Sequence, residues 1–249
     1  MIVYINGNDN RCKYLAKLIE ADGHRVETNI NMLDVCHILY LGRDGAGFEQ
    51  VDFKPNAIVI TLLKNQRLSY LSKLKGFNYE YLYHEDDFVW ENTFICDEAL
   101  IAYMIIDNKI SLANAKVLIL GYGHCGKDLA NKLDAFKAKI TIANRNNHYF
   151  DEVIKKGYSY HSLKHLNLDK YDYVINTIPK QILTRQILST KKTGCKIYDI
   201  ASKPYGMNIQ DRDENYHLLK QLPTKYAYQS SALVLYQAIK KVVDRYAGK

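Results

Sequence analysis

Residues 116–126 read K-V-L-I-L-G-Y-G-H-C-G, an apolar run of strand length followed by three glycines at G-x-G-x-x-G spacing. The apolar residues at positions 129, 130, 133 and 136 then predict an amphipathic helix. Gly121 permits a tight turn, Gly123 lets backbone approach a pyrophosphate, and Gly126 lets the helix lie close to the strand. This strand, turn and helix favour a dinucleotide site over a glycine-rich turn that binds nothing.

The turn itself is the predicted phosphate-binding segment. Its backbone N–H groups and the positive end of the following helix would face the phosphates. The segment consists of Gly121, Tyr122, Gly123, His124, Cys125 and Gly126.

The next predicted strand, residues 139–143, ends at Asn144 and Arg145. In dinucleotide-binding folds with this glycine turn, an acidic residue about 20 positions past the glycines binds the ribose hydroxyls of NAD, whereas arginine accommodates the 2′-phosphate of NADP. No acid stands here, so the sequence favours NADP, with NAD as the alternative. The other interpretation of Arg145 is a solvated loop residue.

Two further predicted strands end in segments that would complete the rim of the cofactor site. Residues 171–176 lead to Thr177, Ile178 and Pro179, and residues 196–200 lead to Ala201 and Ser202. Ligands in such sheets bind beyond the carboxyl ends of the strands, so both segments would flank the cofactor. Pro179 also serves simply to end its strand.

Strand-like runs at residues 2–5, 37–41, 57–61 and 80–83 alternate with helical patterns and predict a smaller parallel α/β layer. The predicted class is α/β, with a Rossmann-type doubly wound domain and a smaller N-terminal α/β domain. The small domain would comprise residues 1–91 with a C-terminal helix at 229–249, whose apolar stripe predicts core packing. A junction helix would occupy residues 92–110, and the Rossmann domain residues 111–228. Residues 97–108 are apolar on most faces, which predicts a helix buried between layers.

The composition of the 249 residues, with 47% hydrophobic and 24% charged, is typical of a soluble globular protein. We find no membrane-span pattern and no signal peptide, so we expect a cytoplasmic protein. Five scattered cysteines without a C-x-x-C pair argue against a disulfide framework or a metal site. The net charge of +7 comes without a basic run interleaved with aromatics and is explained as well by an anionic small molecule, so we expect no nucleic-acid partner.

Two motifs carry a family resemblance: I-N-T-I-P at residues 175–179, and D-I-A-S-K-P at residues 199–204. With Gly7, Asp9, residues 92–93 and Glu98, they resemble the A subunit of dipicolinate synthase, which has arginine in place of Lys203. More distantly, the chain resembles the D-2-hydroxyacid dehydrogenases. The resemblance implies a nicotinamide cofactor, oxidation of a dihydrodipicolinate-type precursor to dipicolinate in spore formation, and a flavoprotein second subunit.

The chain departs from that family where substrate should bind. The family's G-L-P-G and P-K-T-A segments are replaced by Q-L-P-T at 221–224 and Q-S-S-A at 229–232. For a dicarboxylate substrate we consider Lys203 first, then Lys225 or Arg11, because lysine offers a point charge to a carboxylate. Each lysine is equally well explained as a solvated surface charge.

Glu98 is a candidate general base if it is buried, with a place in the first turn of a helix as the alternative. His165 and His217 stand alone in the sequence, which favours structural roles. Besides the dipicolinate synthase type, two functions stay open: an NADP-dependent reductase of another small carboxylic acid, and a non-catalytic nucleotide-binding or sensing subunit. We expect a homo- or hetero-oligomer, with a dimer by analogy.

Overall fold

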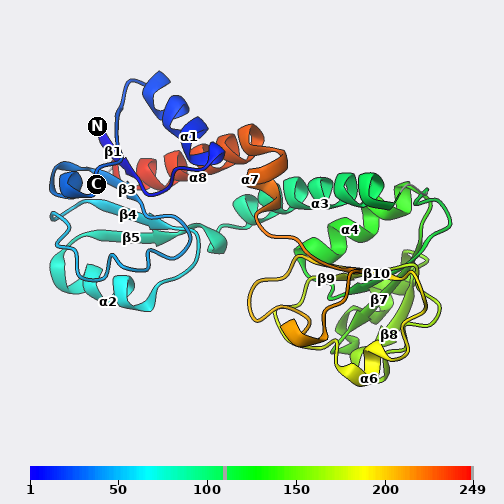
Figure 1. Cartoon of the computed structure of the whole chain (residues 1–249). Helices are drawn as coiled ribbons and strands as arrows, with labels where there is room; N and C mark the ends of the chain where they lie inside the picture. The colour runs from blue at the N-terminus through cyan, green and yellow to red at the C-terminus, as the bar shows by residue number, and fades with distance from the viewer. Residues whose placement is uncertain (109–110, 248–249) are drawn as a thin grey trace. The chain divides into compact units, whose positions relative to one another are not determined.

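The computed structural model describes residues 1–108 and 111–247. Within it the chain forms two compact units (Figure 1). The first unit combines Met1–Ile95 with Pro223–Lys249, and the second is Cys96–Leu222. The predicted limits at residues 91, 110 and 228 stay a prediction, and residues 109–110 and 248–249 of the predicted helices lie outside the described residues.

The first unit is built on a parallel five-stranded sheet with the strand order β2-β1-β3-β4-β5. After β1 the chain adds β2 on one side of that strand and then β3 on the other side, so the strand order has a switch point between β1 and β3. The loops at the carboxyl ends of these two parallel strands therefore lie beside each other. Its elements are β1 (Ile2–Ile5), α1 (Asn10–Ala21), β2 (Arg25–Glu27), β3 (Ile38–Tyr40), β4 (Ile58–Thr61), α2 (Gln66–Lys75), β5 (Asn78–Tyr81), the start of α3 (Asp86–Asn108), most of α7 (Leu222–Tyr226) and α8 (Tyr228–Ala247).

Helices α1 and α8 share one core of the first unit. The side chain of Asp9 caps α1 by accepting a hydrogen bond from the backbone N–H of Cys12 at 2.8 Å. Leu15 of α1 and Leu235 of α8 are fully buried in the same hydrophobic cluster as strand residues of β1 and β3. The predicted packing role of the apolar stripe on α8 is therefore confirmed.

The second unit is built on a parallel six-stranded sheet with the order β11-β10-β9-β6-β7-β8. Its elements after α3 are β6 (Lys116–Leu120), α4 (His124–Ala135), β7 (Lys139–Asn144), α5 (Phe150–Lys155), β8 (Ser159–Ser162), β9 (Tyr173–Asn176), α6 (Arg185–Leu188), β10 (Lys196–Asp199) and β11 (Tyr216–Leu218). Short 3₁₀ helices at Ile30–Val35, Leu82–His84, Asn147–Tyr149, Leu163–His165 and Ile209–Asp211 complete the two units.

Both faces of the second sheet are buried, because alternate residues of β6 enter different cores. Val117 and Ile119 pack in a cluster with α3 and α4, while Leu118 and Leu120 pack in the cluster on the opposite face. Strand order and crossovers match a doubly wound sheet whose order reverses between β6 and β9. The predicted α/β class with a Rossmann-type domain is confirmed.

Helix α3 differs from the prediction in length and burial. It begins at Asp86, well before residue 97, and ends at Asn108. Leu100 and Met104 are fully buried, but Ile105 and Ile106 are 46% and 76% exposed. The prediction of a helix buried between layers is therefore wrong for one side of α3. No helix in the described part of the chain is both long and apolar enough to cross a membrane.

Candidate dinucleotide site

The glycine turn joins β6 to α4 at the point where the strand order of the second sheet reverses. Gly121 has φ of +98°, and a Cβ there would lie 2.5 Å from Thr177 Oγ1. A Cβ on Gly126 would lie 2.2 Å from the carbonyl oxygen of Gly121. Protein packing therefore requires glycine at both positions, as the close approach of helix to strand predicts.

Gly123 is different, because an added Cβ would meet no protein atom within 4 Å. The residue is exposed and has φ of −82°, which any residue adopts. Neither packing nor backbone conformation explains glycine here, whereas close approach of a ligand does. Gly123 also caps α4 without a side-chain hydrogen bond, and the positive end of this 12-residue helix favours an anion. The residues present fit a pyrophosphate.

The side chains in the turn do not all face the predicted ligand. Tyr122 is 1% exposed, and its ring contacts Tyr149 edge-on with centroids 5.5 Å apart. Burial raises the pKa of Tyr122 to about 12, so the phenol stays neutral. His124 is exposed and Cys125 is half-buried. Tyr122 can therefore serve the site only through its backbone.

Asn144 and Arg145 stand at the carboxyl end of β7, the strand next to β6. The side-chain oxygen of Asn144 accepts a hydrogen bond from the backbone N–H of Arg145 at 2.9 Å, which fixes the start of this loop. The Arg145 side chain is exposed and has no acidic partner among the described residues. A free guanidinium at this position suits a 2′-phosphate.

Thr177 holds the loop after β9 against the glycine turn. Its backbone N–H and its hydroxyl both donate to the carbonyl oxygen of Leu120, at 3.1 and 2.8 Å. Ile178 and Pro179 follow at the same edge, half-buried and exposed respectively. Because Leu120 pairs with Asn176 in register, the predicted rim and the turn lie side by side.

A buried carboxylate organises the neighbouring loop after β10. Asp199 is fully buried, and its Oδ1 accepts from Asn176 Nδ2 at 2.9 Å and from Ala201 N at 3.1 Å. Its Oδ2 accepts from Gly206 N and from the Tyr216 hydroxyl, both at 2.6 Å. Four donors compensate the loss of water around this charge. The hydrogen bond from Ala201 N to Asp199 thus fixes the start of the loop that carries the predicted rim residues Ala201 and Ser202.

Replacing Asp199 with asparagine should lower the free energy of unfolding by about 2 kcal/mol, because an amide nitrogen would face two donors that now bind Oδ2. Urea unfolding of the purified chain measures the change. Asp169→Asn, at an exposed position, is the control. A difference below about 0.5 kcal/mol between Asp199→Asn and the unaltered chain would contradict this role.

The predicted catalytic residues are placed less favourably. Lys203 is exposed on the loop after β10, beside the rim, and has no partner among the described residues. Glu98 is exposed in the middle of α3, so neither the burial needed for a general base nor the alternative of a first-turn position is found. Both assignments stay predictions.

Lys225 and Arg11 belong to the first unit. Lys225 is exposed on α7. Arg11 lies in the first turn of α1, where its Nη2 donates to the Tyr40 hydroxyl at 3.5 Å and its buried Nε has no partner. Tyr40 ends β3, so Arg11 lies at the carboxyl edge of the first sheet.

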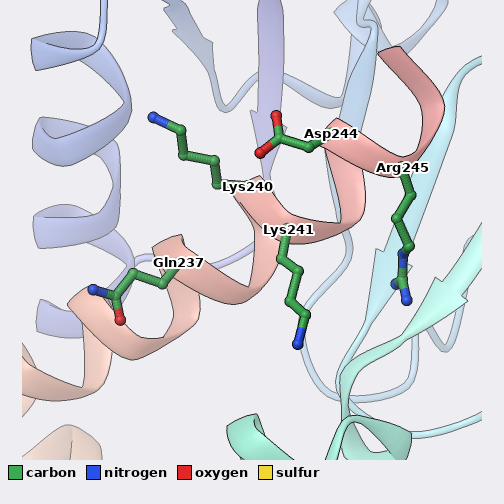
Figure 2. A pocket seen from close by; sticks show the side chains of 5 residues that line it. All are labelled: Gln237, Lys240, Lys241, Asp244 and Arg245. Atoms are coloured by element: carbon green, nitrogen blue, oxygen red, sulfur yellow. The ribbon is translucent and has the colours of Figure 1, made fainter. Parts of the chain in front are cut away.

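An open hollow of about 520 Å³ on α8 is lined by cationic side chains, as Figure 2 shows. Each cation there has an acidic partner within the first unit. Lys240 pairs with Asp22 at 3.2 Å, Lys241 with Asp87 at 3.0 Å, and Arg245 with Glu85 at 2.6 Å. Their charges are compensated, so this hollow has the character of a solvated helix face and not of an anion site.

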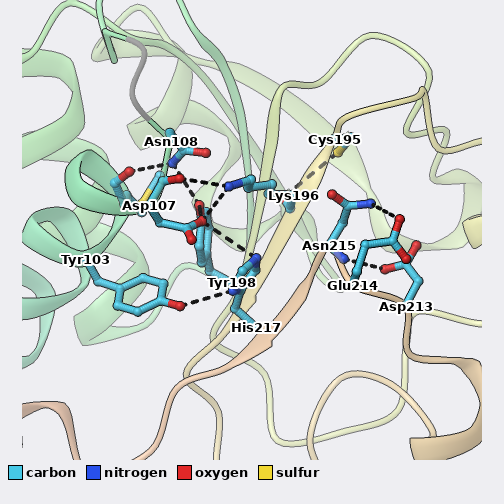
Figure 3. Close-up of polar contacts among 11 residues, drawn as sticks. Tyr103, Asp107, Asn108, Cys195, Lys196, Tyr198, Asp213, Glu214, Asn215 and His217 are labelled. Carbon is cyan, nitrogen blue, oxygen red and sulfur yellow. Dashed lines mark hydrogen bonds and ion pairs between the residues drawn. The ribbon is translucent and has the colours of Figure 1, made fainter.

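The contacts of His217 agree with the structural role that the sequence favours. Its Nδ1 lies 3.2 Å from the Tyr103 hydroxyl, and its Nε2 lies 3.7 Å from Asp107 Oδ2 (Figure 3). Asp107 also accepts from Lys196 Nζ at 2.6 Å and from the Tyr198 hydroxyl at 3.0 Å. Burial lowers the pKa of His217, which favours neutral imidazole. Since Lys196 begins β10, this network fastens the end of α3 to the sheet and does not line the carboxyl edge.

Comparison with known proteins supports a dehydrogenase-type cofactor domain. Residues 104–194 match the NAD binding domain of D-isomer specific 2-hydroxyacid dehydrogenases, a span that includes the glycine turn, Arg145 and Thr177. The match supports a nicotinamide cofactor and an oxidoreductase in general. It does not distinguish NAD from NADP.

The A subunit of dipicolinate synthase from Bacillus subtilis (strain 168) is 27% identical over 132 residues, which is 52% of this chain but only 44% of that protein. The crystal structure of the corresponding protein from Bacillus halodurans has a TM-score of 0.82 at 21% identity and covers 97% of each chain. That of the Bacillus subtilis protein has a TM-score of 0.84 at 18% identity, covering 100% of this chain and 97% of the other. The predicted resemblance to the A subunit of dipicolinate synthase is confirmed, and the two structures share the fold.

Proposed function

We propose that this protein is an NADP-dependent oxidoreductase of the dipicolinate synthase type, which oxidises a dihydrodipicolinate-type precursor to dipicolinate. The observation that carries the proposal is the space left open at Gly123, at the switch point of a doubly wound sheet. The similarity to the A subunit of dipicolinate synthase supports the choice of substrate. The same proposal includes a role in spore formation, a cytoplasmic location, oligomer formation and a flavoprotein second subunit.

The chain's own residues supply binding and orientation. Backbone N–H groups at the start of α4 hold the pyrophosphate, and Arg145 binds the 2′-phosphate. Lys203 attracts a substrate carboxylate beside the rim that Asp199 fixes. When bound, the nicotinamide would accept the hydride that leaves the substrate, and the accompanying proton would pass to solvent.

A reconstituted assay tests the reaction. The chain is purified and supplied with dihydrodipicolinate and NADP, with and without the flavoprotein partner, and reduced cofactor and dipicolinate are measured together. We expect both to form in equal amounts. Cofactor binding without turnover in either arm would contradict the proposed reaction.

That outcome would favour the second candidate, a non-catalytic nucleotide-binding subunit. The specific observation in its favour is the exposure of Glu98, which leaves the predicted general base in solvent. An NADP-dependent reductase of another small carboxylic acid would instead oxidise NADPH when other small oxo or unsaturated acids are supplied.

Replacing Arg145 with alanine should weaken NADP binding roughly 10- to 100-fold and leave NAD binding within about threefold, because only NADP carries the phosphate that the guanidinium binds. Equilibrium titrations with both cofactors measure the effect. Lys155→Ala, an exposed lysine on α5 in the same unit, controls for the loss of one positive charge. Equal weakening of both cofactors would rule out this assignment.

A further inference from the structure

Two cations of the second unit gather on one aromatic ring, that of Tyr205 in the loop after β10. The guanidinium carbon of Arg212 lies 5.7 Å from the ring centroid of Tyr205 and 4.9 Å from that of Tyr216. The ammonium of Lys220 lies 4.9 Å from the Tyr205 centroid. The two positive charges are therefore no more than 10.6 Å apart. Aromatic faces hold both side chains through cation–π contact.

The neighbouring acids are already engaged. Between residues 196 and 222 the acidic side chains are Asp199, Asp211, Asp213 and Glu214. Asp199 is saturated by the four donors described above. Asp211 pairs with Arg185 at 2.6 Å and Asp213 with Lys191 at 2.5 Å, while Glu214 accepts from Asn215 Nδ2 at 3.3 Å.

Arg212 and Lys220 consequently have no carboxylate partner among residues 1–108 and 111–247. The Nε of Arg212 is buried and has no hydrogen-bond partner. A buried guanidinium N–H normally binds an acceptor, and the described residues supply none to this one. The paired cations of the α8 hollow show the contrasting arrangement, in which every charge is compensated within the protein.

The pair also lies beside the proposed cofactor rim. The backbone N–H of Tyr205 donates to the carbonyl oxygen of Ser202 at 3.0 Å, and Gly206 follows as the donor to Asp199. Lys220 follows Leu219, whose N–H donates to the carbonyl oxygen of Asp199 at 2.9 Å. Ring and ammonium therefore stand just beyond the ends of β10 and β11, where substrates of doubly wound sheets bind.

From this arrangement we infer that Arg212 and Lys220 form a carboxylate-binding subsite, which takes one carboxylate of a small dicarboxylic acid and determines specificity for it. The guanidinium offers a planar fork to that group and the ammonium adds a point charge. Lys203, exposed on the same loop, remains for the second carboxylate. The inference rests on the proposed function in its choice of a dicarboxylate, but its binding test needs no turnover.

The test compares two ligands on the full chain saturated with NADP, by calorimetric titration. Pyridine-2,6-dicarboxylate should bind at least tenfold more tightly than pyridine-2-carboxylate. Arg212→Gln should weaken binding of the dicarboxylate roughly 10- to 50-fold, and Lys220→Gln roughly three- to tenfold. Arg212→Lys keeps the charge without the fork and should fall between Arg212→Gln and the unaltered chain.

Lys139→Gln is the matched control. It removes one positive charge from the exposed first residue of β7, at the opposite edge of the same sheet, and should leave both affinities within twofold. Equal weakening by Lys139→Gln and Arg212→Gln would overturn the subsite, as would failure of the unaltered chain to bind the dicarboxylate. If thermal melting shows that Arg212→Gln does not fold, Lys220→Gln, at an exposed residue, decides alone.

The two proposals can fail separately. Dicarboxylate binding that depends on Arg212, without turnover of dihydrodipicolinate, would retain the subsite and reject the reaction. Turnover with an unchanged affinity in Arg212→Gln would retain the reaction and reject the subsite.

Discussion

Replacing Gly123 with alanine is expected to weaken NADP binding roughly 10- to 100-fold while lowering the free energy of unfolding by about 1 kcal/mol at most. The added methyl group meets no protein atom within 4 Å and the backbone conformation suits alanine. It would instead occupy the space through which a pyrophosphate approaches the backbone. Cofactor titration and urea unfolding of the same preparation measure both effects.

Gly126→Ala is the matched control for that result. Its Cβ would lie 2.2 Å from the Gly121 carbonyl oxygen, so helix and strand must move apart. We expect a loss of about 3 kcal/mol of stability together with the loss of cofactor binding. A Gly123→Ala protein that binds NADP as well as the unaltered chain would remove the observation that carries the proposed function.

Asp97→Asn is expected to stabilise the protein at pH 8 relative to the unaltered chain, by an amount on the order of a few kcal/mol. Asp97 is fully buried on α3, and neither oxygen of its ionised carboxylate has a hydrogen-bond donor among the described residues. Burial and the negative charge of Asp128 raise its pKa to about 9. A hydrogen bond from the protonated Asp97 carboxyl to Asp128 also raises this pKa, and Lys132 pairs with Asp128.

The sign follows from proton linkage. The pKa of Asp97 is higher in the folded than in the unfolded chain, where it is near 3.8. Its contribution to stability is therefore fully present below about pH 3.8 and is lost as the pH rises toward 9, at about 1.4 kcal/mol per unit. Asparagine carries no such proton, so the difference in stability between the two proteins should be smallest at pH 5 and should grow toward pH 8.

Urea unfolding at pH 5, 6.5 and 8 measures this divergence. Asp134→Asn, an exposed position on α4, should follow the unaltered chain at every pH. A constant difference between Asp97→Asn and the unaltered chain over this range would show that Asp97 is not the group that loses its proton.

The glycine turn and the apolar runs sufficed to predict the class and most strands, because the central strands, such as β4 and β9, are buried on both faces of a parallel sheet. The short edge strands β2 and β8 were missed. Their residues, Arg25–Glu27 and Ser159–Ser162, are largely polar and half-exposed, so no hydrophobic period marks them. The start of α3 was missed because its first two turns, from Asp86, mix charged and aromatic residues.

The sequence likewise predicts one part of the candidate site and not the other. Spacing alone located the turn, Arg145 and the rim, since parallel strands bring their carboxyl ends to one edge. The sequence could not show that Asp199 is a buried anchor, nor that Arg212 and Tyr205 meet across seven positions, because these contacts depend on how loops close. The sequence gives no sign that Asp97 is buried, since one acid within an apolar helix resembles a solvated position.

The sharing of one core by α1 and α8 has a consequence for synthesis. A ribosome that has made residues 1–95 has supplied the first sheet but not α8, which follows the whole second unit. Until then Leu15 and Ile19 lack the α8 residues of their cluster, such as Leu235 and Ile239. The second unit, continuous in the chain, can complete its core earlier, so we expect it to fold first during translation, against the usual N-terminal order.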